Sequence, residues 1–365
     1  MKKILSVLLA SVMLLGLCSV AAADGPIQVD VFYCDYSDTY LGSVRTAMQE
    51  KLDAAGDLFT YNFYDGALNQ ATQTQQVETA LTRGTDLLIM NIVTTGSEEA
   101  AQNIVDMAAE KGVPVIFFNR EISDAVVNSY DQCAFVGTDA DEAGYMEGQA
   151  IADFLLLEGN LDKYDLNGDK EIAYLMFRGE LGNAEAFGRT KYSVYQANLL
   201  LEPYGYKLVP SAGNQKDDTQ PDDGISPYYL YGNWSAANAR NLMDTALTIY
   251  GLDNGDIELI IANNDDQALG AIESMNEKGY NTGEEGAGYI PVFGVDATVV
   301  AQDAISNGKM TGTVKQDAVG MADYILFLAA NIQAGKALMD VPEYYNVDEN
   351  VDKVRVPYAI FTGVE

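Results

Sequence analysis

The segment DLNGDKEIA, which begins at Asp165, places oxygen-bearing side chains at alternate positions. Asp165, Asn167 and Asp169 have the spacing of the first ligands of an EF-hand-like calcium loop, whose sixth residue is glycine and whose twelfth is a bidentate glutamate. Here the sixth residue is Lys170, and the twelfth, Met176, lies in an apolar run. The segment is therefore open to three interpretations: half a calcium site, a turn rich in Asp, Asn and Gly, or a site completed by a residue far away in the chain.

A second set of polar side chains follows apolar runs that read as strands. Asp38 comes after VDVFYC, Asn119 after VPVIFF and Asn264 after ELIIAN, while Asp296 ends IPVFGVD. Ligands of parallel sheets bind beyond the carboxyl ends of the strands, so we expect these side chains to lie near one another. No phosphate-binding glycine loop follows any of these runs, so nucleotide binding is not supported.

Two aromatic residues accompany this polar set. Tyr40 lies beside Asp38, and Trp234 is the single tryptophan of the chain. A sugar ring stacks its apolar faces on aromatic rings, while planar carboxylate and amide groups bind its hydroxyls, so the set predicts a carbohydrate site. Each residue alone also has a structural explanation: Asp38 could cap the next helix, Asn119 and Asn264 could cap a helix or bond loop backbone, and Trp234 could belong to the core.

The elements that must position these residues alternate along the chain. Strand-like runs cover 29–33, 60–64, 87–93, 113–119, 171–177, 206–210, 258–264 and 290–296. Segments with helical spacing cover 42–56, 72–84, 97–112, 142–157, 184–200, 234–250 and 266–279. This alternation predicts an α/β protein with two doubly wound parallel-sheet lobes. The acidic segment 214–233 interrupts it and reads as a long surface loop with an aromatic end.

Composition excludes several functions. The formal net charge of −33 makes nucleic acid and anionic lipid poor partners. The chain has no histidine, which excludes Ser-His-Asp and Cys-His catalysis and the common zinc sites. A glycoside hydrolase with a carboxylate pair needs no histidine and stays possible, with Glu185 and either Asp38 or Asp296 as the pair.

The amino-terminal segment indicates export. Residues 1–23 have a positively charged start, a short apolar core and a run of alanines ending at Ala23, which predicts a cleaved signal peptide. The alternative is a lipoprotein signal in which Cys18 is acylated, so the protein would be periplasmic or lipid-tethered at the cell surface. Cys34 and Cys133 could then pair, or remain two buried thiols.

Seven runs extend the interpretation from a sugar site to a family. VPVIFFNRE, YDQCAFVGTDADEAG, DLNGDKEI, ELIIANNDDQALGAIE, IPVFGVDA, GTVKQDA and KVRVPY resemble, in this order, the periplasmic galactose/glucose-binding proteins of bacterial ABC sugar uptake. The resemblance covers nearly the whole mature chain apart from 214–233. It implies the type I periplasmic-binding fold, in which two lobes joined by a three-segment hinge close over one sugar.

The resemblance also implies lobe boundaries. Crossings are expected near Thr138–Asp139, Lys315–Gln316 and Arg355–Val356. The amino-terminal lobe would comprise 24–138 and 316–355, and the carboxy-terminal lobe 139–315 and 356–365, with the sugar cleft between them.

Carried over by position, the resemblance makes Tyr40 and Trp234 the two faces of a sandwich around the sugar. The hydroxyl-binding residues would be Asp38 and Asn119 from the first lobe and Arg189, Asn264 and Asp296 from the second. Three further positions depart from the family pattern: Asn183 replaces a histidine, Glu185 an aspartate, and Gln316 an asparagine. Since a buried hydroxyl left unpaired costs about 1–3 kcal/mol, these changes leave the sugar open. Galactose and glucose come first, with xylose or a substituted galactoside as alternatives.

The resemblance gives the opening segment a distant partner, because in the family this loop binds calcium and a remote glutamate closes it. The implied Ca²⁺ ligands are side chains of Asp165, Asn167 and Asp169, the carbonyl of Glu171, and both oxygens of Glu258. Ala173 offers no oxygen at the ninth position, and Lys170 must adopt a strained backbone, so a structural but weakened site is expected. The turn interpretation remains the alternative.

The leading hypothesis is an exported receptor, and not an enzyme, that captures a monosaccharide by lobe closure and delivers it to a membrane ABC permease. A chemoreceptor or sensor is a compatible second partner. A sugar-responsive repressor shares the fold, but the chain lacks a basic DNA-binding segment and has the wrong charge.

Overall fold

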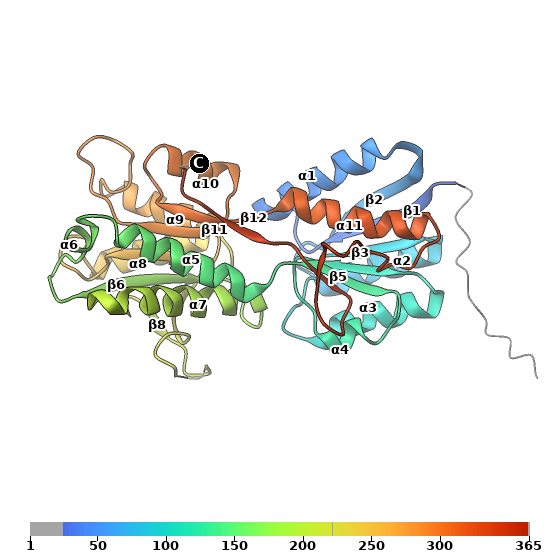
Figure 1. The fold of residues 1–365 in the computed structure, drawn as a ribbon, viewed down its shortest axis with the longest axis horizontal. Coiled ribbons are helices and arrows are strands. Elements are labelled where there is room, and N and C mark those ends of the chain that lie inside the picture. The colour runs from blue at the N-terminus through green and yellow to red at the C-terminus, as the bar shows by residue number, and fades with distance from the viewer. Residues whose placement is uncertain (1–24, 221, 364–365) are drawn as a thin grey trace, which may run out of the picture.

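The computed structural model describes residues 25–220 and 222–363. The predicted signal peptide and Cys18 lie outside these residues. Figure 1 shows two lobes side by side, each built on its own sheet and joined by extended segments. The prediction of an α/β protein with two doubly wound parallel-sheet lobes is confirmed.

The first lobe contains a sheet in the order β13-β14-β5-β4-β3-β1-β2, in which β1 to β5 run parallel. Its strands are β1 (Ile27–Tyr33), β2 (Phe59–Asp65), β3 (Leu87–Met90), β4 (Val115–Phe118), β5 (Cys133–Gly137), β13 (Asn346–Val347) and β14 (Lys353–Arg355). Its helices are α1 (Thr39–Ala54), α2 (Gln70–Arg83), α3 (Glu98–Lys111), α4 (Asp124–Val127) and α11 (Ala318–Gln333), with a short 3-10 turn at Gly56–Leu58.

Both faces of this sheet are covered, which explains why its strands read as continuous apolar runs. In β3, Leu87 and Ile89 pack toward α1 and α11, whereas Leu88 and Met90 pack toward α2 and α3. Successive side chains of a strand point to opposite faces, so a strand buried on both sides has no polar alternation.

The second lobe repeats this plan with the order β15-β12-β11-β10-β6-β9-β8, and β7 also pairs with β6. Its strands are β6 (Glu171–Arg178), β7 (Lys207–Pro210), β8 (Gln215–Lys216), β9 (Tyr228–Tyr231), β10 (Leu259–Ala262), β11 (Val292–Asp296), β12 (Gly312–Gln316) and β15 (Tyr358–Phe361). Its helices are α5 (Ala140–Leu155), α6 (Asn160–Tyr164), α7 (Ala184–Leu201), α8 (Ala236–Ile249), α9 (Asp265–Asn276) and α10 (Val299–Ser306), with a 3-10 turn at Glu202–Tyr204.

Within the described residues the chain passes between the two sheets after β5, after β12 and after β14 (Figure 1). These strands end at Gly137, Gln316 and Arg355. We keep the residue-level lobe boundaries 24–138 with 316–355, and 139–315 with 356–365, as a proposal.

The segment 214–233 differs from the prediction. It contains β8 and β9, which form an antiparallel pair, and β9 also extends the sheet beside β6 through the Phe177–Leu230 pair. Tyr229 and Leu230 are buried, because the aromatic run offers the apolar surface that a sheet strand needs. The prediction of one long surface loop is therefore wrong at its aromatic end.

Cys34 and Cys133 are both free and buried. Cys34 packs with the core on the α1 and α11 side of the first sheet, whereas Cys133 packs on the α2 and α3 side. The sheet separates the two thiols, so of the two alternatives the structure has the pair of buried thiols. No helix among residues 25–220 and 222–363 is long and apolar enough to cross a membrane.

Candidate binding site

A cavity between the two lobes holds about 420 Å³ of atom-free space, including its open mouth. It is lined by Asp38, Tyr40, Leu41, Asn119, Arg120, Asn183, Glu185, Arg189, Trp234, Asn264, Asp296 and Gln316. All the residues predicted to bind sugar thus line this one cavity. Leu41 and Arg120 were not predicted, although each directly follows a predicted residue in the sequence.

Sheet topology explains why residues so far apart in sequence meet here. β1 lies between β2 and β3, and β6 lies between β9 and β10, so the connections that leave neighbouring strands diverge at these points. The cavity residues follow the carboxyl ends of β1, β4, β6, β9, β10, β11 and β12. A crevice at such a switch point is where ligands of doubly wound sheets bind.

Three cavity residues also begin helices. Asp38, Asn183 and Asn264 cap α1, α7 and α9, and each side chain accepts the backbone N–H three residues on, at 2.7, 3.0 and 3.0 Å respectively. Asp38 and Asn264 therefore cap helices, as the structural explanation proposed, and they also line the cavity. The caps bring positively polarised helix N-termini, where hydrogen-bond acceptors are favoured, to the cavity wall.

Three other cavity residues have positive φ: Asn119 at 61°, Trp234 at 63° and Asp296 at 123°. Side chains other than glycine rarely adopt these angles, and a residue held there costs on the order of 1–3 kcal/mol. Such strain persists where the surrounding structure requires it, typically at ligand-binding positions. Among the described residues these are three of ten non-glycine residues with positive φ, so the strain accompanies the cavity but does not by itself locate it.

Arg189 organises the floor of the cavity. Its Nη1 donates to the carbonyl of Asn263 at 2.8 Å, and its Nη2 donates to Gln316 Oε1 at 3.1 Å and to the Tyr358 hydroxyl at 3.0 Å. Asp296 Oδ1 lies 3.7 Å from Nη1. Because its guanidinium is almost completely buried, these acceptors fix its orientation.

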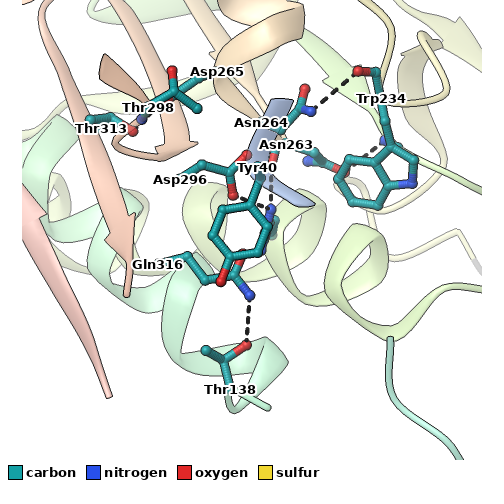
Figure 2. A network of polar contacts seen from close by, with 12 residues as sticks. Tyr40, Thr138, Trp234, Asn263, Asn264, Asp265, Asp296, Thr298, Thr313 and Gln316 are labelled. Atoms are coloured by element: carbon teal, nitrogen blue, oxygen red, sulfur yellow. Dashed lines mark hydrogen bonds and ion pairs between the residues drawn. The ribbon is translucent and has the colours of Figure 1, made fainter. Parts of the chain in front are cut away.

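Gln316 links this network to the hinge region. Its Nε2 donates to Thr138 Oγ1 at 3.3 Å, and Thr138 in turn lies 2.8 Å from the Tyr358 hydroxyl. Figure 2 shows Tyr40, Asp296 and Gln316 close together, with Trp234 apart from them on the right. The longer side chain that replaces the family asparagine is therefore held at both of its polar atoms.

The buried carboxyl of Glu185 has no hydrogen-bond partner within the described residues. The residue is only 4% exposed. Burial raises the pKa of Glu185 to about 7, against the opposing effect of Arg189. Burial likewise raises the pKa of Asp296 well above its ordinary value, again opposed by Arg189. Unpaired acceptors in a buried cavity are costly unless a ligand supplies donors, so this cavity is suited to hydroxyl groups.

The aromatic residues supply the complementary surfaces. Tyr40 is 7% exposed, and its hydroxyl donates to Met321 Sδ at 3.8 Å, which fixes the ring against α11. Arg189 Cζ lies 5.7 Å from the centre of the Trp234 ring. Aromatic faces beside paired donors and unpaired acceptors match the surface of a polyhydroxylated ring.

The loop at Asp165 lies away from this cavity and holds together through its own hydrogen bonds. Both Asp165 oxygens accept backbone N–H groups, from Gly168 at 2.8 Å and from Lys170 at 3.0 Å. Glu258 joins this loop to β6, because its two oxygens accept the N–H groups of Leu166 and Ala173, each at 2.7 Å. Its role as a calcium ligand stays a prediction.

The fit of calcium to this loop follows from the same contacts. Asn167 and Asp169 also accept backbone N–H groups, from Asp169 at 3.0 Å and Glu171 at 2.8 Å. The described residues include no group of three His, Cys, Asp or Glu side chains placed to hold a metal ion. Lys170 has the expected strained backbone, with φ at 66°. The arrangement is satisfied without an ion, and calcium binding stays a prediction.

The chain is similar in sequence to known binding proteins. Residues 29–337 match the sequence model of the periplasmic binding protein domain. The chain is 30% identical over 338 residues to the D-galactose/methyl-galactoside binding periplasmic protein MglB of Haemophilus influenzae, which covers 93% of this chain and 89% of that protein. It is 25% identical over 334 residues to the D-xylose-binding periplasmic protein of Escherichia coli, which covers 92% and 86%.

A solved structure shares the fold. The ABC transporter solute binding protein from Bacillus halodurans with bound myo-inositol superposes with a TM-score of 0.66 and covers 93% of this chain and 96% of that chain. At 24% identity this likeness concerns the fold alone.

Proposed function

This chain belongs to the periplasmic binding protein family, and from that premise we propose that it is the exported receptor of an ABC sugar transporter. It captures one monosaccharide in the cavity between its lobes and delivers it to a membrane permease. The relatives named above are binding proteins, and this chain is a binding protein and not an enzyme.

One observation carries the proposal: the predicted sugar-binding residues gather in a single inter-lobe cavity that combines aromatic faces with polar side chains, including the buried, unpartnered carboxyl of Glu185. A sugar ring is the ligand class that fits the chemistry of this lining, because it has apolar faces and an edge of hydroxyl groups.

We propose galactose or glucose as the first candidates. The supporting comparison is the protein from Haemophilus influenzae, whose name states D-galactose and methyl-galactoside binding. Xylose, or a galactoside with a substituent, is the alternative, because the similarity to the D-xylose-binding protein spans as much of the chain. Asn183, Glu185 and Gln316 decide among them, since each presents polar atoms to the cavity that differ in reach from the family pattern.

Lobe closure is the proposed mechanism. Thr39 Oγ1 of the first lobe donates to Asp266 Oδ2 of the second at 2.9 Å, and Arg120 pairs with Glu180 across the same cleft. A sugar that contacts both lobes favours the state in which they meet, and a permease that reads this state receives the sugar. Periplasmic location fits the family. A lipid tether at Cys18, a chemoreceptor partner and the calcium ion remain predictions.

Trp234 provides a direct test, because it is the single tryptophan of the chain and lines the cavity. D-Galactose, D-glucose, D-xylose and myo-inositol are titrated into the mature protein, with intrinsic fluorescence and calorimetry as parallel measurements. At least one sugar should bind with a Kd below about 1 mM, equivalent to roughly 4 kcal/mol, and shift the emission. Binding weaker than this for every sugar would overturn the proposal.

A further inference from the structure

The ion pair between Arg120 and Glu180 joins the two lobes at the edge of the sugar cavity. Arg120 follows β4 in the first lobe, and Glu180 follows β6 in the second. The Arg120 side chain is 10% exposed and that of Glu180 is 25% exposed, so the pair is largely screened from water. Arg120 Nη2 also donates to the carbonyl of Val93 at 3.1 Å, and Nη1 lies 3.7 Å from Cys34 Sγ.

A second, outer crevice lies next to the sugar cavity and holds about 1090 Å³ of atom-free space, including its open mouth. Asp38, Arg120 and Trp234 line both spaces and therefore form the wall between them. Glu180 lines only the outer crevice, together with residues such as Asp35, Asn233 and Asp266. Arg120 thus faces the sugar site on one side and its counter-charge on the other.

The three wall residues are held in different ways. Asp38 is fixed within the first lobe as the cap of α1, and Trp234 is fixed within the second lobe against Gly179. Arg120 is bonded to the Val93 carbonyl of its own lobe, and it is the one wall residue that is also held by a charge from the opposite lobe. This part of the wall is therefore completed only when the lobes meet.

We propose that the Arg120–Glu180 pair is a specificity gate that closes the sugar cavity toward the outer crevice and limits the ligand to an unsubstituted monosaccharide. This inference rests on the proposed sugar-binding function, and it excludes the substituted galactoside given there as an alternative ligand. A ring substituent directed toward the outer crevice would have to pass through the wall that Arg120 occupies, and it would displace a largely buried guanidinium from its carboxylate. Breaking a largely buried ion pair by moving one partner leaves the other charge uncompensated, so substituted ligands are rejected.

Removal of the Glu180 charge should open this gate. Without the carboxylate, Arg120 keeps only its first-lobe contacts with Val93 and Cys34, so a substituent displaces it from the wall more easily and reaches the outer crevice. The crevice is lined mainly by acidic and neutral polar groups, so it accommodates a neutral substituent such as a methyl group and disfavours an anionic one.

The test compares free sugars with their methyl glycosides. Calorimetry gives the Kd of D-galactose, D-glucose and the α- and β-methyl glycosides of each, for the wild type, Glu180→Gln and Glu180→Ala. The control is Thr39→Val, which removes the Thr39–Asp266 hydrogen bond in the same crevice but leaves the Arg120 wall intact. Thermal unfolding of each variant without ligand establishes that it is folded.

The measured quantity is the ratio of the Kd for a methyl glycoside to the Kd for its free sugar. We expect a ratio of 30 or more in the wild type, a decrease of at least about tenfold in Glu180→Ala, and a smaller decrease in Glu180→Gln. Thr39→Val should weaken both ligands equally and leave the ratio unchanged. A wild-type ratio below about three, or a Glu180→Ala ratio within twofold of wild type, would overturn the gate while sugar binding itself stands. Absence of any monosaccharide binding would remove both proposals.

Discussion

Trp234 packs directly against Gly179 in the sugar cavity. A β-carbon at position 179 would lie 2.3–2.4 Å from three atoms of the indole ring, closer than such contacts occur in proteins. Gly179 follows β6, and its N–H donates to Asn263 Oδ1 at 3.0 Å, which holds the backbone beneath the ring in place. The glycine therefore sets the depth at which the single tryptophan lies in the cavity.

Gly179→Ala should displace the indole and weaken sugar binding. A misplaced stacking surface loses an interaction of about 1–2 kcal/mol, so we expect the Kd to rise roughly five- to thirtyfold, with an altered tryptophan emission maximum in the free protein. Gly42→Ala is the matched control, because an added β-carbon there meets nothing within 4 Å and lies in helix α1. Equal affinities for the two variants would contradict this role of Gly179.

Arg189→Lys should weaken sugar binding although it keeps the charge. A lysine ammonium cannot reproduce the planar set of bonds to Asn263, Gln316 and Tyr358. We expect a loss of about 2–3 kcal/mol, or roughly 30- to 150-fold in Kd by calorimetry. Arg240→Lys serves for comparison, because Arg240 forms its ion pairs with Glu273 and Glu277 on the surface. Near-equal effects of the two changes would argue against the network.

The raised pKa of Glu185 predicts a pH dependence of stability. Its pKa is about 7 in the folded protein against 4.5 ordinarily, so the folded state binds the proton more tightly. The stability that this carboxyl contributes is fully present below about pH 4.5 and is lost as the pH rises to about 7.

In urea unfolding of the ligand-free protein between pH 5 and 8, the wild type should therefore lose stability as the pH rises. Over this range the free energy of unfolding should decrease by about 1–3 kcal/mol less in Glu185→Gln than in the wild type, because the variant lacks one of the buried carboxyls. Burial also raises the pKa values of Asp265 and Asp296, so these two carboxyls preserve part of the dependence of stability on pH. The exposed Glu50, changed to glutamine, is the control, and parallel slopes for wild type and Glu185→Gln would refute the assignment.

Glu258→Gln should destabilise the protein even when metal ions are chelated. The carboxylate joins the N–H groups of Leu166 and Ala173, and an amide accepts at only one of its two polar atoms. We expect a loss of about 1–3 kcal/mol in urea unfolding with EGTA, and no comparable loss for Glu284→Gln on the surface.

The same samples test calcium binding at this loop. Stabilisation of the wild type by more than about 0.5 kcal/mol on addition of 1 mM calcium, absent in Glu258→Gln, would support the predicted ion. A smaller shift would support the turn interpretation, in which the hydrogen bonds of Glu258 and Asp165 are sufficient.

Local pattern was enough to predict much of this protein. The alternation of apolar runs and helical segments predicted both sheets, because strand and helix periodicities are properties of neighbouring residues. Placing Asp38, Asn119, Asn264 and Asp296 after strands was enough to expect them at one edge, since carboxyl ends of parallel strands meet there. The family resemblance added Asn183, Glu185, Arg189 and Gln316, and the structure brings all the predicted residues together with Leu41 and Arg120, which were not predicted.

Other features depend on which surfaces meet in three dimensions. β9 joined the sheet because Leu230 finds Phe177 beside it, a contact that the composition of 214–233 does not reveal. Cys34 and Cys133 pack into the cores on opposite sides of the first sheet. The Arg120–Glu180 pair links residues 60 positions apart, and Trp234 meets Gly179 only after β6 and β9 have paired. Periodicity specifies the element to which a residue belongs, whereas its packing partner is decided by the long-range arrangement of those elements, which only the folded chain contains.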